Sequence, residues 1–147
     1  SSAPALAMAA DNLALNPQLD ADRALWREAD VFESLRALKS DGQRFDLIIL
    51  DPPKFAPSAT HAERAARAYR DINAFGFRLL NPGGLLMTYS CSGGIRSEHF
   101  QQIVADAAVS AGCSARILRR LAAPPDHPVA LHFSEGEYLK GLLCQVD

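Results

Sequence analysis

The feature that most constrains the fold is the apolar stretch at residues 45–50 (FDLIIL), which stops abruptly at Asp51-Pro52-Pro53. From residue 47 onward it lacks the polar alternation of a strand with one wet face, which predicts a parallel strand covered on both faces. Ligands of such sheets bind at the carboxyl ends of the strands, where Asp51 would stand. The two prolines make the turn stiff. Asp51 is therefore a candidate site residue, or the Asx residue of a strand-ending turn.

A second apolar stretch, residues 85–89 (LLMTY), also ends in residues that are candidates for catalysis or binding. It runs into a loop of small side chains, Ser90-Cys91-Ser92, followed by two glycines. The carboxyl ends of neighbouring parallel strands lie at one edge of a sheet. We therefore expect the two loops to lie next to each other and to hold a ligand between them.

The order of the remaining segments indicates the fold class. Apolar spacing, caps and glycine or proline stops predict helices at 4–15, 30–41, 61–80 and 97–111, with Asp30 and Ser97 as N-caps and Asn81-Pro82-Gly83-Gly84 closing the third helix. Strands are predicted at 45–50, 85–89, 115–121 and 138–146, with a short one possible at 25–27. This alternation predicts an α/β doubly wound sheet with a terminal antiparallel strand pair, in one domain of residues 1–147.

Composition excludes several classes of protein. The net charge of −2 gives no electrostatic footprint of a nucleic-acid binder that works alone. Three cysteines without a CxxC pair predict neither a disulfide framework nor a metal site, and favour a reducing cytoplasm. No apolar run has membrane-spanning length, so no membrane partner is expected.

One expected part of such a sheet is missing from the sequence. A doubly wound sheet that binds a cofactor normally opens with a strand and a glycine-rich turn. This chain opens on a predicted helix, and no GxGxxG-like loop occurs in it.

Several motifs occur together in a characteristic order along nearly the whole chain. They are DPPKF, YRDIN, LLNPGG, YSCSGG, DHPV and EGEYLKG. With them the chain resembles the large-subunit ribosomal RNA methyltransferase I family, which uses S-adenosylmethionine to make 5-methylcytosine in rRNA. The resemblance implies a Rossmann-like class I methyltransferase sheet, of which this chain is the later part. The first strands and the cofactor loop would precede Ser1, so we expect the isolated chain to bind cofactor weakly and to be inactive.

The resemblance also implies catalytic roles for two residues. Cytosine C5 is a poor nucleophile, and its methylation benefits from addition of a thiolate to C6. Cys91 occupies the position of the family's SCS nucleophile, whereas Cys113 and Cys144 are expected to be small buried hydrophobes. Asp51 would donate a proton or hydrogen bond at N3, which requires a carboxyl group with a raised pKa from partial burial. The base that removes the C5 proton is Asp51 or a water.

Further residues are candidates for binding cofactor or substrate. The cofactor residues are expected to be Asp30, Val31, Asp51 and Pro52, and the substrate residues Pro53, Lys54, Phe55, Ser90, Ser92 and His127. Most have a simpler structural interpretation. Asp30 also fits a helix cap, Lys54 a solvated charge, Phe55 a core ring and His127 a structural loop residue.

Two other functions fit parts of the pattern. An amino-group methyltransferase acting on adenine or guanine also uses an Asp-Pro-Pro turn, but it has no use for Cys91, and its aromatic residue usually stands where this chain has Lys54. A catalytically silent RNA-binding fragment is the other alternative. An incomplete sheet would also expose a strand edge, which makes a homodimer possible.

Overall fold

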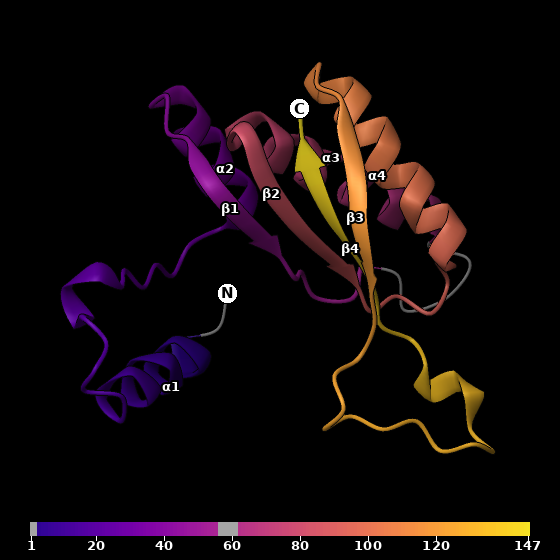
Figure 1. Ribbon diagram of the computed structural model, residues 1–147, viewed down its shortest axis with the longest axis horizontal. Helices are drawn as coiled ribbons and strands as arrows, with labels where there is room; N and C mark the ends of the chain where they lie inside the picture. Colours follow the sequence, from indigo (N-terminus) through magenta and orange to yellow (C-terminus); the bar gives the residue numbers. More distant parts are fainter. Residues whose placement is uncertain (1–2, 56–61) are drawn as a thin grey trace. The chain divides into compact units, whose positions relative to one another are not determined.

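The computed structural model describes residues 3–55 and 62–147, drawn in colour in Figure 1. The chain forms two compact units, Ser1–Ala37 and Leu38–Asp147, and the second helix crosses the boundary between them. The elements are α1 (Ala3–Ala14), η1 (Ala21–Arg23), α2 (Val31–Ser40), β1 (Phe45–Leu50), α3 (Ala62–Leu79), β2 (Leu80–Ser90), α4 (Ser97–Ala111), β3 (Ala115–Leu121), η3 (Ser134–Gly136) and β4 (Lys140–Val146).

The first unit is helical and irregular. The predicted helix at 4–15 is confirmed as α1, and Asp30 caps α2 as predicted, because its Oδ1 accepts hydrogen bonds from the backbone N–H groups of Phe32 at 2.9 Å and Glu33 at 3.0 Å. The short strand considered at 25–27 does not form. Leu25 is 78% exposed, and a strand without a partner leaves its backbone groups unpaired.

The second unit contains a sheet with the strand order β1-β2-β4-β3 (Figure 1). β1 and β2 are parallel, with Leu50 opposite Thr88. β4 runs antiparallel to both β2 and β3, which confirms the predicted terminal antiparallel pair. This mixed α/β arrangement is the predicted fold class.

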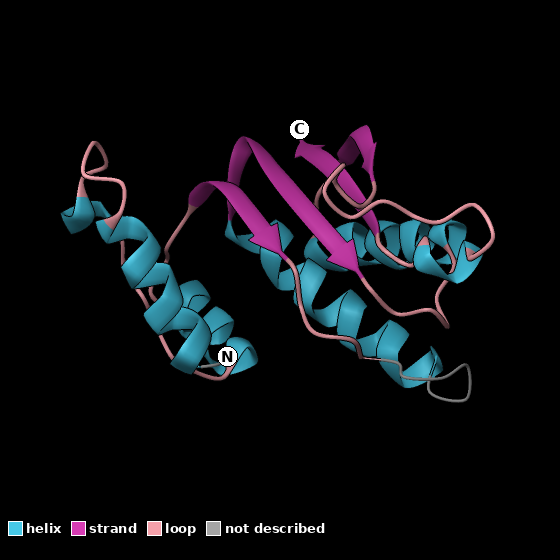
Figure 2. Cartoon of the chain, turned by 90° about the horizontal axis from the view of Figure 1, so that it is seen from below, coloured by secondary structure: helices cyan, strands magenta, loops and turns pink. Residues whose placement is uncertain are grey.

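Helices α3 and α4 pack against each other and against one face of the sheet (Figure 2). Close packing depends on Gly76 of α3, where an added Cβ would lie 3.1 Å from side-chain carbons of both Leu50 and Leu86. The prediction that β1 is covered on both faces is wrong. Leu47 and Ile49, which alternate with Leu50 along the strand, are 49% and 58% exposed, because α3 and α4 cover only the other face.

Two predicted boundaries also differ from the structure. Asn81-Pro82-Gly83-Gly84 does not form a separate loop after α3, because β2 already begins at Leu80, opposite Phe45. The register shift that follows Phe45 accommodates these extra residues. Ser97 is the first residue of α4 rather than its cap. The N-cap is Arg96, whose side chain makes no capping hydrogen bond.

Candidate active site

The candidate site begins where β1 and β2 end. The two strands are neighbouring and parallel, and their arrows reach the same edge of the sheet in Figure 1. Asp51 directly follows β1, and Cys91 directly follows β2. The loop that joins β3 to β4 leaves the sheet at this edge as well (Figure 1). The expectation that both loops lie at one edge is therefore confirmed.

The segment after β1 combines an anchored backbone with accessible polar groups. Pro52 is buried, whereas Asp51, Pro53 and Lys54 are exposed. The carboxylate of Asp51 is thus accessible from solvent in this chain. The partial burial that its proposed acid role requires is not supplied by the residues that the structure describes.

Tyr69 of α3 connects the two loops. It is fully buried, and its hydroxyl lies 3.0 Å from that of Ser92. Its ring packs against Phe55, with the centroids 4.8 Å apart, and edge-on against Phe100 at 5.6 Å. Phe55 therefore makes the core contact that was one of its two predicted interpretations. The loop after β1 and the loop after β2 both depend on the position of one buried ring.

The loop after β2 is held by several short interactions. Ser90 and Ser92 are fully buried, and the Ser90 hydroxyl accepts a hydrogen bond from the Ser92 backbone N–H at 3.3 Å. The backbone N–H of Ile95 donates to the Ser92 carbonyl at 3.1 Å, which closes a turn. Cys91 is half-buried in this loop, with access for a reagent or substrate.

Lys140, the first residue of β4, also belongs to this site. Its Nζ donates hydrogen bonds to the carbonyls of Ser92 at 2.7 Å and Ile95 at 2.8 Å. Burial lowers the pKa of Lys140, and the nearby Lys54 lowers it further, whereas Cys91 raises it. The ammonium group therefore lies within electrostatic reach of both Cys91 and Lys54.

Of the other two cysteines, only Cys144 is buried as predicted, whereas Cys113 is half-buried like Cys91. All three thiols are free. Cys144 is 3% exposed on β4, and burial raises its pKa to about 11. Burial also raises the pKa of Cys113, against the opposing effect of Arg78. Cys113 lies in the short turn between α4 and β3 and Cys144 lies within β4, so neither belongs to the loop after β2.

Three of the predicted site residues lie on other elements. Asp30 and Val31 lie at the start of α2 in the first unit, and both are exposed. His127 is exposed in the loop between β3 and β4, where its Nδ1 lies 3.3 Å from Asp126.

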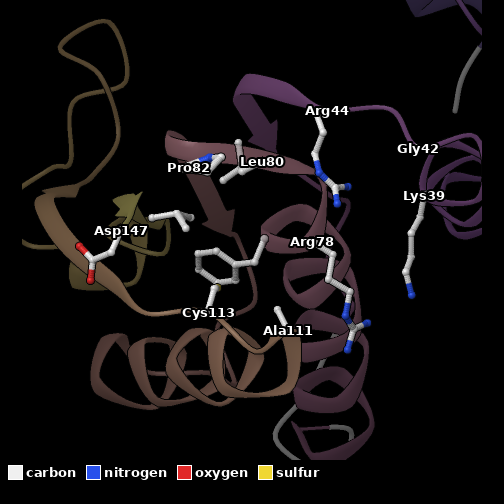
Figure 3. Close-up of a pocket in the computed structure, with 11 residues that line it drawn as sticks. Lys39, Gly42, Arg44, Arg78, Leu80, Pro82, Ala111, Cys113 and Asp147 are labelled. Atoms are coloured by element: carbon white, nitrogen blue, oxygen red, sulfur yellow. The ribbon is translucent and has the colours of Figure 1, made fainter.

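A cavity of about 430 Å³ lies away from the candidate site, at the opposite edge of the sheet. Its lining includes residues at the start of β1, at the start of β2 and at the end of β4. Figure 3 shows Lys39, Arg44 and Arg78 beside it. None of the predicted site residues lines it. The candidate site is therefore defined by its loops rather than by this cavity.

Two residues of the site were not predicted as site residues. Tyr69 lies in the helix predicted at 61–80, and helical spacing does not reveal that its hydroxyl reaches Ser92. Lys140 lies in the EGEYLKG motif, but its role depends on the antiparallel pairing that places it opposite Ser90. A lysine at the start of a mostly apolar strand was the available signal.

Comparison with known proteins identifies the family. The chain is 50% identical over 141 residues to ribosomal RNA large subunit methyltransferase I of Tolumonas auensis, covering 96% of this chain and 35% of that protein. It is 47% identical over 142 residues to the protein of the same name from Shewanella frigidimarina, covering 97% of this chain and 36% of the relative. The chain belongs to this family. It spans about a third of the relatives' length and matches their C-terminal part.

Solved structures support the fold of this family member. SMU.776 complexed with SAH aligns with a TM-score of 0.65 at 21% identity, covering 80% of this chain and 30% of that one. The O-methyltransferase from Bacillus cereus in complex with SAH aligns with a TM-score of 0.57 at 17% identity, covering 100% of this chain and 60% of that one. No protein-family model matches the chain. The described sheet is thus a Rossmann-like methyltransferase sheet.

Residues 3–55 and 62–147 contain no cluster of three or more metal-ligating side chains. Among the helices of the same residues, none is both long and apolar enough to cross a membrane.

Proposed function

We propose that this chain is the C-terminal catalytic part of an S-adenosylmethionine-dependent methyltransferase that acts on rRNA. The family relationship at 46–50% identity supports this proposal. So does the likeness of the fold to structures that were solved with SAH or SAM. When bound, the cofactor would supply the methyl group.

We further propose that the target atom is C5 of a cytosine and that Cys91 is the nucleophile. Its thiolate would add to C6, moving an electron pair to C5, which then takes the methyl group. Loss of the C5 proton would expel Cys91 and restore the ring. The observation that carries this proposal is the position of Cys91 in an accessible loop, at the end of the strand beside the Asp51 loop.

Asp51 would act at N3 of the same base. A hydrogen bond or proton there relieves the negative charge that thiolate addition creates on the ring. Pro52 is buried, so the backbone that carries the carboxylate is anchored. The exposed carboxylate would be covered only when base and cofactor are present. The residue that accepts the C5 proton is Asp51 or a water.

The described residues offer contacts for parts of the proposed cofactor and not for all of it. We propose Asp51 and Pro52 for its methyl end, whereas Asp30 and Val31, which belong to the first unit, are proposed for its adenosine end on the family resemblance alone. Asp30 already uses one carboxylate oxygen to cap α2, which leaves the other for a hydroxyl or amino group. The sequence has no glycine-rich cradle. We propose that residues of a longer protein complete the cofactor site, and that the chain alone binds cofactor weakly and is inactive.

The substrate residues would act in two ways. Pro53 and Lys54 are exposed and free to contact the base and its phosphate, and His127 belongs to the β3–β4 loop, which leaves the sheet at the same edge. The burial of Ser90 and Ser92 and the packing of Phe55 favour a different role for these three, which is to hold the loops in place.

Two further proposals concern the surroundings of the protein. Free thiols at Cys91, Cys113 and Cys144 fit the reducing cytoplasm. A homodimer would use the edge strand β1, where Leu47 and Ile49 are half-exposed. Light scattering of the purified protein would measure its mass in solution.

The covalent step can be tested with rRNA that contains 5-fluorocytidine, in which fluorine replaces the C5 proton and blocks release. We expect the full-length protein to form an adduct that mass spectrometry locates at Cys91. Cys91→Ser should give neither adduct nor product, and Cys113→Ser should give both. An active Cys91→Ser protein would refute the covalent mechanism. Methylation of an amino group in that variant would support the amino-group alternative instead.

Binding of cofactor to the isolated chain is a separate test. Calorimetry with S-adenosylmethionine should give little or no heat of binding for this chain and a saturable curve for the full-length protein. Micromolar affinity of the isolated chain would refute the proposal that other residues complete the site.

A further inference from the structure

Lys140 is positioned by the sheet and not by the loop that it contacts. In the pairing of β4 with β2 it lies opposite Ser90, and Ser90 is the residue directly before Cys91. Two of its three N–H donors go to the carbonyls of Ser92 and Ile95, the two ends of the turn that follows Cys91. Lys140 therefore fixes the shape of this turn from the neighbouring strand.

The charge of Lys140 also reaches the thiol. Among the described residues, Lys140 on β4 interacts electrostatically with both Cys91 and Lys54, the loop after the neighbouring strand begins with Asp51, and Tyr69 on α3 contacts the adjacent Ser92. Lys54 is exposed, so solvent and salt screen its charge. Lys140 is part-buried and held by two hydrogen bonds, so its position is fixed and its charge is screened less.

We propose that Lys140 is a positioning residue for Cys91, which holds the Cys91 loop through two hydrogen bonds and stabilises the thiolate through its ammonium charge. The proposal rests on the role of Cys91 as nucleophile. A cysteine attacks as the thiolate, and a neighbouring lysine favours that form. The desolvation cost of burying the ammonium group is offset by its hydrogen bonds to two carbonyls and, in the reactive state, by its attraction to the thiolate.

The test measures the rate of Cys91 alkylation by iodoacetamide as a function of pH in the full-length protein, with peptide-resolved mass spectrometry. Lys140→Gln keeps two N–H donors but removes the charge, and Lys140→Arg keeps the charge. We expect Lys140→Gln to slow the alkylation of Cys91 near neutral pH and to displace its pH profile upward. Lys140→Arg should remain close to the unmodified protein.

Lys39→Gln is the matched control, because it removes the same charge from an exposed position at the opposite edge of the sheet. It should leave the profile unchanged. Cys144 serves as a folding control in the same digest, since its burial should protect it equally in every variant.

An unchanged profile for Lys140→Gln would overturn the proposal. So would an equal shift in Lys140→Arg, because the charge would then not be the cause. The assay needs neither RNA nor cofactor, so its outcome is independent of the adduct test for the proposed function.

Discussion

The hydroxyl groups of Tyr69 and Ser92 lie 3.0 Å apart in a fully buried position, between a helix and the loop that carries Cys91. The two residues are separated by 23 positions in the sequence. Because the Tyr69 ring also packs on Phe55, one side chain sets the positions of both loops of the candidate site. A change at this ring should affect stability and the site together.

Tyr69→Phe should lower the free energy of unfolding by about 1 to 2 kcal/mol, because it removes one partner from a buried hydrogen bond while keeping the ring. Urea denaturation followed by circular dichroism measures this change. Tyr138→Phe is the control, since Tyr138 is 50% exposed and its hydroxyl can be hydrated. Equal stability of the two variants would show that the buried hydrogen bond contributes little.

The sequence was sufficient to predict the regular elements and the adjacency of the two loops. Apolar runs and glycine stops placed β1, β3, β4 and the helix ends close to their observed bounds. It was not sufficient for burial. Leu47 and Ile49 look like core residues in the sequence, but their exposure depends on which segments cover the sheet, and α3 and α4 cover one face only.

The candidate site could be predicted only in part, because some of its contacts join segments that are distant in the sequence. Asp51 and Cys91 follow strands, so their placement could be inferred from strand order. Lys140 reaches the Cys91 loop only through antiparallel pairing with β2, and that pairing is a contact between distant segments. Periodicity reports the face on which a residue lies and not its partner across the sheet.

Asp30 allows the helix-cap role to be separated from the proposed cofactor role. Asp30→Ala should cost about 1 kcal/mol of stability, because it leaves two N–H groups at the start of α2 without their acceptor. Asp30→Ser should retain most of the stability, since serine also caps helices. Thermal denaturation measures both. A serine variant as unstable as the alanine variant would argue against a simple cap.

In the full-length protein the same two variants report on cofactor binding. If the carboxylate contacts the cofactor, Asp30→Ser should bind S-adenosylmethionine more weakly despite its restored cap. If the affinity for S-adenosylmethionine is instead restored in Asp30→Ser together with the stability, Asp30 acts only as a helix cap.

Gly141 lies opposite Tyr89 where β4 pairs with β2. An added Cβ would lie 2.5 Å from Cδ1 and 2.7 Å from Cε1 of the Tyr89 ring, so the ring would have to move. Gly141→Ala should therefore cost about 1 to 3 kcal/mol of stability. Gly93→Ala is the matched control, because its added Cβ would meet no atom within 4 Å.

The cause can be verified with a double-mutant cycle. In a Tyr89→Ala background, Gly141→Ala should cost much less, because the ring that it would displace is gone. The same cost in both backgrounds would place the strain elsewhere, for example against Leu121, whose Cβ lies 3.1 Å from the added atom. Urea denaturation of the four proteins gives the coupling energy.

The buried thiol of Cys144 predicts a loss of stability at alkaline pH. Burial raises its pKa from 9.0 to about 11, so the folded state favours the neutral thiol more strongly than the unfolded state does. The associated stability is fully present below pH 9 and is lost as the pH rises toward 11. Its magnitude is about 2 to 3 kcal/mol, from a shift of about two pKa units.

Cys144→Ala isolates this contribution. The variant has a constant cavity cost but no thiol to titrate, whereas Cys113 and all other groups titrate in both proteins. We therefore expect the difference in unfolding free energy between the unmodified protein and the variant to be constant from pH 7 to 9 and to shrink toward pH 11. Urea denaturation at intervals of half a pH unit measures it. A constant difference throughout would mean that the thiol ionises in the folded protein as readily as in the unfolded chain, and so that β4 opens to solvent.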